Sequence, residues 1–236
     1  MTELIYQTDS YVKEFDARVT KIDPENNAVV LDRTAFYPGG GGQPNDVGQL
    51  IVNDRVYPVT KVLRGNLHVI EGECPPLDAV VHGVLDWSRR YQLMRTHTAM
   101  HILCGVVWRD YQASVTGGNM EPLKGRLDFE FERMEKELVA EIEAAIIAEV
   151  EAGRDVTVNI LPRDEAFKIP DLIRTKINLL PEGIPEVRTI DIKGLDLQAD
   201  GGTHVANTRE VGPLTIVDYK SKGRINKRIT VGLKEL

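Results

Sequence analysis

The chain has 236 residues, 42% hydrophobic and 28% charged, which is the composition of a globular protein and not of a disordered one. No run reaches the roughly 20 apolar residues of a membrane helix, and the first residues lack the basic-then-apolar layout of a signal peptide. Two cysteines, Cys74 and Cys104, are too few for a disulfide framework, so we expect a cytoplasmic protein without membrane contact. The net charge of −7 argues against a generic nucleic-acid coat, although a local basic patch is compatible with it.

The first part of the chain is predicted to be β structure. Apolar–polar alternation, or short apolar runs bounded by turn residues, mark segments 11–22, 27–31, 49–52, 56–59, 61–63 and 67–70. Short strands at this spacing predict a small barrel or a bent sheet. Between them, residues 37–44 contain four successive glycines between two prolines, which excludes the interior of a strand.

Beyond residue 86 the apolar residues recur every three to four positions, which predicts helices at 87–109 and 134–152. Strand-like runs follow at 156–161, 187–190, 214–217 and 228–231. Helices and strands in blocks, without strict alternation, favour an α+β fold. We therefore expect two domains, a β-barrel-like one at 1–88 and an α+β one at 89–236.

Two pairs of possible metal ligands share a four-residue spacing. His97 and His101 lie one turn apart in the first predicted helix, so both imidazoles project from one face. Asp200 and His204 follow on a glycine-containing turn, where the backbone can approach a ligand closely. Together the four residues predict one shared metal site. In a protein of this size, a histidine-rich site with a carboxylate favours an open, catalytic metal over a closed structural zinc.

Three motifs carry a resemblance to a known family. They are the glycine-rich segment 34–43, the histidine segment 95–103 and the turn 201–205. Together they closely resemble the free-standing alanyl-tRNA editing proteins (AlaX) of the medium-length type, which are relatives of the editing domain of alanyl-tRNA synthetase. The resemblance implies a small N-terminal glycine-motif β-barrel followed by an α+β metal-binding editing domain.

The resemblance also implies an activity and a cofactor. Members of the family hydrolyse an amino acid wrongly esterified to alanine tRNA, chiefly serine and also glycine. They bind one zinc ion through an HxxxH pair and a CxxxH pair, which correspond to His97, His101 and His204 here, with Asp200 in the place of the cysteine. Because a carboxylate is a harder ligand than a thiolate, this departure widens the choice of metal to Mn, Fe or Co. Asp200 is either a direct ligand or a side chain that orients one of the histidines.

The mechanism needs an attacking water and donors for the developing oxyanion. The sequence leaves open whether the metal activates the water or positions substrate and water. Backbone N–H groups of a glycine run can bind an oxyanion, and the alternative is a mobile loop. The candidates are Gly39, Gly40, Gly41 and Gly42. Gln43, which follows directly, is a candidate for a hydrogen bond to the substrate.

Thr34 is the candidate for specificity. Serine is larger than alanine, so size cannot exclude the correct alanine ester. A site built to bond a substrate hydroxyl rejects the analogue that lacks it by up to roughly 10⁴–10⁵, because its own polar group is left unpaired. The resemblance points to Thr34, and the alternative is a strand threonine without substrate contact.

RNA binding has to overcome the negative net charge. Two basic clusters are candidate tRNA contacts, and a solvated face is the alternative for each. The first cluster precedes the histidine motif, and the second lies near the C-terminus. They comprise Arg89 and Arg90, and Lys222, Arg224 and Lys227.

Two alternative functions remain at this point. One is editing of another mischarged tRNA, as in the related domain of threonyl-tRNA synthetase, which also faces serine. The other is a non-catalytic, zinc-stabilised RNA-binding module, an interpretation that Asp200 in place of cysteine favours. No Walker-type loop occurs, so nothing indicates that the protein makes aminoacyl-adenylates itself.

Overall fold

The computed structural model describes residues 2–132, 134–175, 180 and 183–236. The chain divides into two compact units, Met1–Gln92 and Leu93–Leu236. The first unit is a barrel and the second contains helices and two sheets, so the expected α+β class is confirmed. The division into independent domains at 1–88 and 89–236 remains a prediction.

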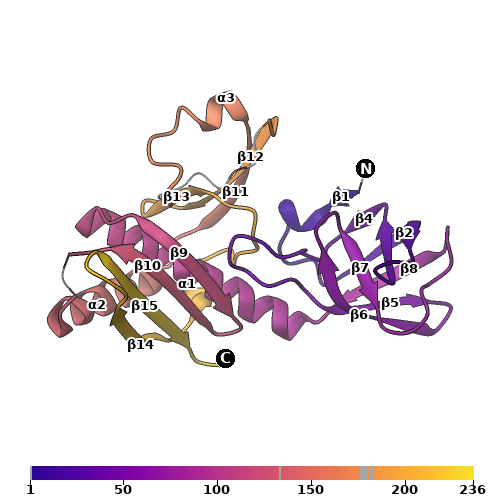
Figure 1. Ribbon diagram of the computed structural model, residues 1–236, viewed down its shortest axis with the longest axis horizontal. Coiled ribbons are helices and arrows are strands. Elements are labelled where there is room, and N and C mark those ends of the chain that lie inside the picture. The colour runs from indigo at the N-terminus through magenta and orange to yellow at the C-terminus, as the bar shows by residue number, and fades with distance from the viewer. Residues whose placement is uncertain (1, 133, 176–179, 181–182) are drawn as a thin grey trace. The chain divides into compact units, whose positions relative to one another are not determined.

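The first unit is a closed six-stranded antiparallel barrel (Figure 1). Residues alternate between solvent and the interior over 14–19 of its longest strand, as a half-buried strand requires. In order around the barrel the strands are β2 (Glu14–Asp23), β3 (Ala28–Leu31), β7 (Leu67–Ile70), β6 (Arg55–Leu63), β5 (Gly48–Val52) and β8 (Val80–Leu85). A short parallel pair, β1 (Glu3–Leu4) and β4 (Arg33–Thr34), and the 3₁₀ turn η1 (Ile5–Gln7) complete the unit.

The second unit contains two sheets and two long helices. The four-stranded sheet has the order β14 (Leu214–Ser221), β15 (Asn226–Leu233), β10 (Lys124–Glu130) and β9 (Val115–Glu121). The three-stranded sheet has the order β11 (Val156–Pro162), β12 (Glu186–Ile192) and β13 (Asp196–Ala199). The helical elements are α1 (Trp87–Tyr111), which begins in the first unit, α2 (Lys136–Ala152), α3 (Arg163–Ala166) and η2 (Thr208–Val211).

Helix α1 is held tightly against the four-stranded sheet (Figure 1). A Cβ at Gly125 on β10 would lie 2.6 Å from Met100 Sδ, so a larger residue there would force the Met100 side chain to move. At its buried face, the Arg95 guanidinium donates hydrogen bonds to the backbone oxygens of Val211 and Lys234. These contacts fix the rotation of the helix that carries His97. Among the described residues, no helix has the length and apolar character needed to cross a membrane.

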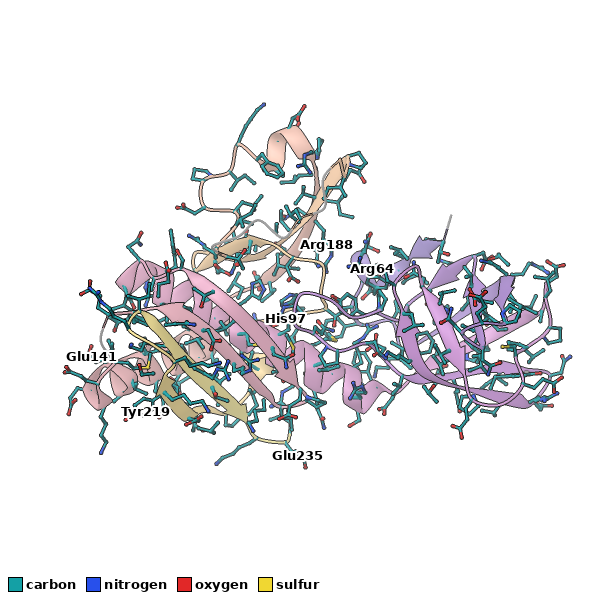
Figure 2. The ribbon with its side chains drawn as sticks, viewed as in Figure 1. Arg64, His97, Glu141, Arg188, Tyr219 and Glu235 are labelled. Carbon is teal, nitrogen blue, oxygen red and sulfur yellow. The ribbon has the colours of Figure 1, made fainter. Side chains whose placement is uncertain are left out.

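The C-terminal basic run forms the turn between β14 and β15. Lys222 and Arg224 are exposed there, and Tyr219 of β14 is 39% exposed (Figure 2). Lys227 differs, because its ammonium group is largely buried and donates to Ser221 Oγ and to the backbone oxygens of Gly223 and Arg224 at 2.7–3.0 Å. The prediction of Lys227 as an RNA contact is therefore wrong in this structure, since its three donors hold the turn together.

Arg90 is likewise not a surface cation. Its side chain is 0% exposed, and Nε donates to both oxygens of Asp46 at 3.0 and 2.9 Å. The same guanidinium donates to the backbone oxygens of Ser10 and Ala35. Asp46 also accepts the Tyr37 N–H at 2.7 Å. A phosphate cannot reach this guanidinium, so the prediction of Arg90 as a tRNA contact is corrected to a structural ion pair of the barrel unit.

We predict that Arg90→Met lowers the free energy of unfolding by about 3–5 kcal/mol, because it leaves the Asp46 charge buried and unpaired. Arg33→Met is the matched control, since Arg33 pairs with Glu3 at the surface, where such a pair contributes about 0–1 kcal/mol. Urea unfolding followed by circular dichroism measures both variants. Equal losses of stability in the two variants would contradict this account of the Arg90 ion pair.

Candidate metal centre

The first two candidate ligands come from one face of α1. His97 and His101 are 4% and 7% exposed, and their ring centroids lie 5.1 Å apart. The four-residue spacing on a continuous helix brings the rings this close. Figure 2 labels His97. The helix thus presents two imidazoles at fixed separation.

The other two candidate ligands come from the turn that follows β13. The Asp200 N–H donates to the Arg188 backbone oxygen at 3.1 Å, and Arg188 NH1 donates back to the Asp200 oxygen at 2.9 Å. The Gly202 N–H donates to Asp200 Oδ1 at 2.6 Å and closes a tight turn. At the far end the Ala206 oxygen accepts the Val156 N–H. Both ends of the turn are therefore tied to the three-stranded sheet and its flank.

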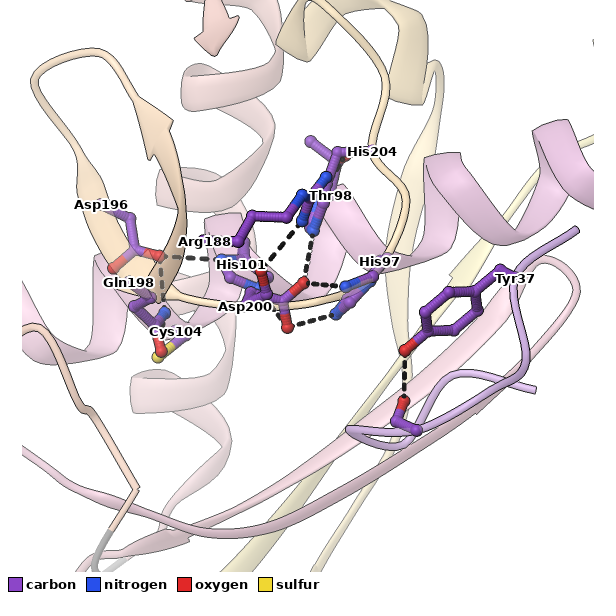
Figure 3. A network of polar contacts seen from close by, with 12 residues as sticks. Tyr37, His97, Thr98, His101, Cys104, Arg188, Asp196, Gln198, Asp200 and His204 are labelled. Carbon is purple, nitrogen blue, oxygen red and sulfur yellow. Dashed lines mark hydrogen bonds and ion pairs between the residues drawn. The ribbon is translucent and has the colours of Figure 1, made fainter. Parts of the chain in front are cut away.

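The structure brings the four residues together. One ligand atom from each of His97, His101, Asp200 and His204 lies within 4.8 Å of the others. Asp200 Oδ2 lies 3.5 Å from His97 Nε2 and 3.9 Å from His101 Nε2, while Oδ1 lies 3.1 Å from His204 Nε2 (Figure 3). Three imidazole nitrogens thus face one carboxylate.

The electrostatics of the cluster treat its imidazoles differently: burial lowers the pKa of His101, but the hydrogen bond to Asp196 and the charge of Asp200 outweigh burial and raise it, whereas the pKa values of the other two histidines are lowered. Burial lowers the pKa of His97 to about 4, against the opposing charge of Asp200. Burial and the charge of His97 hold the pKa of His204 well below its usual value. Burial raises the pKa of Asp200, but the charges of the surrounding histidines outweigh it and keep this pKa well below the usual range. Near neutral pH, Asp200 is therefore ionised, and His97 and His204 are neutral.

Each imidazole also has a partner on its other side. His101 Nδ1 lies 3.1 Å from Asp196 Oδ2, and His204 Nδ1 lies 3.2 Å from Thr98 Oγ1. His97 forms a hydrogen bond with the backbone of Thr203. Partners of this kind orient metal-bound histidines and leave Nε2 for the ion.

The donor set fits a divalent transition metal. Three imidazole nitrogens and one carboxylate oxygen are common ligands of zinc, and the same set accepts Mn, Fe or Co. Asp200 faces all three Nε2 atoms, which supports a direct contact with the ion over a purely orienting role.

The glycine segment lies in the first unit and has an unusual backbone. All four glycines have positive φ, 81°, 139°, 56° and 90° for Gly39 to Gly42. The Gly40 N–H donates to the Gln43 oxygen at 3.0 Å, and the Gln43 N–H donates back at 2.9 Å. Because its N–H is used inside this turn, Gly40 is removed from the predicted oxyanion donors. Gln43 is buried, with 2% exposed.

Thr34 is buried in the same unit, and its hydroxyl already has two partners. Thr34 Oγ1 accepts the Phe36 N–H at 3.1 Å and lies 2.8 Å from His68 Nε2. His68 Nδ1 faces the Val29 oxygen at 3.2 Å, so Nδ1 carries the proton and Nε2 accepts from the threonine. Burial lowers the pKa of His68 to about 4, which keeps it neutral. The expectation of an unpaired hydroxyl at Thr34 is therefore wrong.

Three residues around the histidines escaped the sequence interpretation: Thr98, Asp196 and Gln198. Thr98 lies between the two helical histidines. Asp196 stands four residues before Asp200, so the same spacing that marked Asp200 and His204 continues one step upstream. This repetition was the available signal. The sequence interpretation did not extend the pattern to Asp196, and equal spacing outside a helix does not by itself fix a common face.

Comparison with known families identifies the domains. A model of the threonyl and alanyl tRNA synthetase second additional domain matches residues 187–230, which include Asp200 and His204. A model of class II (A) tRNA synthetases matches residues 5–89. The fold and the site thus define a protein built on domains found in these synthetases.

Full-length relatives narrow this class. The chain is 41% identical to the alanyl-tRNA editing protein AlaX-M of Saccharolobus solfataricus, over 99% of this chain and 100% of that protein. It is 35% identical to AlaX-M of Methanosarcina acetivorans, over 97% of this chain and 98% of that protein. An alanine–tRNA ligase of Thermococcus kodakarensis is 40% identical over 92% of this chain, which spans 24% of that ligase. The chain therefore belongs to the family of AlaX-M alanyl-tRNA editing proteins, and the resemblance inferred from three motifs is confirmed.

We predict that Asp200→Cys tightens zinc binding by about tenfold or more, because a thiolate suits zinc better than a carboxylate does. Competitive chelator titration under reducing conditions measures the change. Asp218→Cys is the control for zinc bound by any added thiol, since Asp218 is exposed on β14. Zinc affinity equal to or weaker than that of the unmodified protein would mean that Asp200 does not occupy a ligand position.

Proposed function

We propose that this chain hydrolyses the ester bond of alanine tRNA charged with serine, and also of the glycine-charged form, with one zinc ion at His97, His101, Asp200 and His204. Membership of the AlaX-M family makes it an alanyl-tRNA editing deacylase. The observation that supports this site is the approach of four ligand atoms to within 4.8 Å of one another. Similarity to AlaX-M proteins over nearly the whole chain supports action in trans.

The residues of the site have different proposed roles in the hydrolysis. A zinc ion held by this cluster supplies a Lewis acid for the ester carbonyl, and Mn, Fe or Co fits the same donors. His97 and His204 stay neutral through burial and keep their Nε2 lone pairs for binding. Asp200 contributes the negative charge. Gly39, Gly41 and Gly42 are the proposed N–H donors to the carbonyl oxygen as it gains charge, and Gln43 is a proposed substrate contact.

Thr34 is proposed to recognise the serine hydroxyl, but by a different energetic route from the one expected. Its proton is committed to His68 and one lone pair to the Phe36 N–H. The remaining lone pair can accept a hydrogen bond from the serine hydroxyl. Alanine then leaves no donor unpaired, so discrimination comes from one added hydrogen bond, worth about 0.5–1.5 kcal/mol.

The tRNA contacts and the location are further proposals. Arg89 is half-buried and donates to the Asn45 oxygen at 3.3 Å, and Lys222 and Arg224 are exposed on the β14–β15 turn. These three cations are the proposed contacts with the phosphate backbone. A cytoplasmic location agrees with the two free cysteines, Cys74 and Cys104.

The central experiment is deacylation of alanine tRNA charged with serine, glycine or alanine, with and without a chelator. We expect hydrolysis of the serine ester to fall by about 100-fold or more on metal removal and in His101→Ala, and to return when zinc is added back to the unmodified protein. Serine-charged threonine tRNA is the comparison substrate. Faster hydrolysis of that substrate would favour threonine-system editing, and undiminished activity in both the chelated protein and His101→Ala would contradict a metal role.

A second prediction concerns selectivity. Thr34→Val should lower the ratio of kcat/KM for serine over alanine esters by about 3–10-fold, the value of one neutral hydrogen bond. Thr34→Ser keeps the hydroxyl and should keep the ratio. A ratio unchanged in Thr34→Val would show that discrimination lies elsewhere, and a fall near 10⁴ would show that the hydroxyl is unpaired when alanine is bound.

A further inference from the structure

Asp196, the first residue of β13, is a buried carboxylate tied to a candidate ligand. Its side chain is 0% exposed. Its Oδ2 accepts hydrogen bonds from His101 Nδ1 at 3.1 Å and from Gln198 Nε2 at 2.6 Å. Gln198 Nε2 also donates to Cys104 Sγ at 3.3 Å, so a chain of polar contacts connects β13 with α1 (Figure 3).

A glycine makes this approach between β13 and α1 possible. A Cβ at Gly105 would lie 3.0 Å from Asp196 Cβ and 2.9 Å from Leu195 Cγ. Any larger residue would push the carboxylate away from the helix that carries His101. The backbone is therefore shaped to place Asp196 against the helix.

The other carboxylate oxygen is poorly satisfied. Oδ1 is buried, and no residue in the described part of the chain donates a hydrogen bond to it. Arg174 Nε lies 3.7 Å away, beyond hydrogen-bond distance, and its guanidinium lies over the Trp108 ring. A buried carboxylate in this state is unfavourable unless a further positive charge lies close by. A cation bound at His101 Nε2 would supply that charge from the opposite edge of the ring.

Asp196 differs in its hydrogen-bonding chemistry from the hydroxyl that contacts His204. The Thr98 hydroxyl beside His204 can donate or accept, so it is compatible with either tautomer. An ionised carboxylate only accepts. The proton of His101 must therefore stay on Nδ1, which leaves the Nε2 lone pair toward Asp200 and the other histidines.

We propose that Asp196 is a positioning residue for the metal centre, which fixes the tautomer and aim of His101 through the hydrogen bond to Nδ1 and places a second carboxylate beside the ion. The inference rests on the proposed metal role of His101.

The test compares metal affinity in three variants of the full-length protein. Asp196→Leu removes both the acceptor and the charge, and Asp196→Asn keeps an oxygen for His101 and Gln198 but removes the charge. Asp128→Asn is the matched control, because Asp128 is also buried in the second unit, where it pairs with Arg228 at 2.7 and 2.8 Å. Zinc affinity is measured by competitive chelator titration, and the visible spectrum of bound Co²⁺ reports its coordination.

We expect zinc affinity to fall by about 10–100-fold in Asp196→Leu and by about 3–10-fold in Asp196→Asn, with an altered Co²⁺ spectrum, while Asp128→Asn stays within about twofold of the unmodified protein. A purely structural role would lower the melting temperature of the metal-free protein and leave the affinity unchanged, which would overturn the proposal. If Asp196→Leu fails to fold, unchanged affinity in Asp196→Asn overturns it alone. Failure of the unmodified protein to bind zinc or Co²⁺ would instead refute the proposed metal site, and with it this inference.

Discussion

The convergence of three imidazoles on the half-buried carboxylate of Asp200 is the constraint on which the second unit depends. Removing an ionised carboxylate from water is costly unless charge and hydrogen bonds compensate for it. Here the Gly202 N–H donates one hydrogen bond, but the three Nε2 edges at 3.1–3.9 Å turn lone pairs toward the carboxylate and cannot compensate for its charge. The cluster is therefore most stable with a cation at its centre. Without a cation, three imidazole lone pairs around one carboxylate are electrostatically unfavourable.

Helix α1 and the turn that follows β13 hold the four candidate ligands in place. Helix α1 fixes two histidines relative to each other, and its rotation is set by Arg95 and by the close contact of Met100 with Gly125. The turn carrying the other two residues is tied to Arg188 at one end and to Val156 at the other. Since both supports are built from backbone hydrogen bonds and close packing, the ligands need little reorganisation to bind an ion. Preorganisation of this kind is what a catalytic metal centre requires.

The sequence predicted features with a strong local signal and missed those that depend on tertiary contacts. The helix at 87–109 and the pairing of His97 with His101 followed from the 3.6-residue period. Strand β9 was missed because Gly117 and Gly118 weaken any strand pattern. The segments 56–59 and 61–63 were predicted as two strands, but they form β6 with a register shift between Val59 and Lys61. The burial of Arg90 depends on Asp46, which lies 44 residues away, and no local pattern encodes such a pairing.

The carboxylate at position 200, where the resemblance implies a cysteine, has a physical advantage that hardness alone does not describe. A thiolate and an ionised carboxylate bring the same charge, so the exchange leaves the electrostatic balance with a divalent ion intact. A carboxylate has two oxygens, however, and in Asp200 they are used differently. Oδ1 closes the turn by accepting the Gly202 N–H, while Oδ2 faces the two histidines of α1. A single sulfur atom cannot do both equally well, because sulfur is a weak acceptor. We therefore expect the aspartate to close the ligand turn more firmly and a cysteine there to bind zinc more tightly.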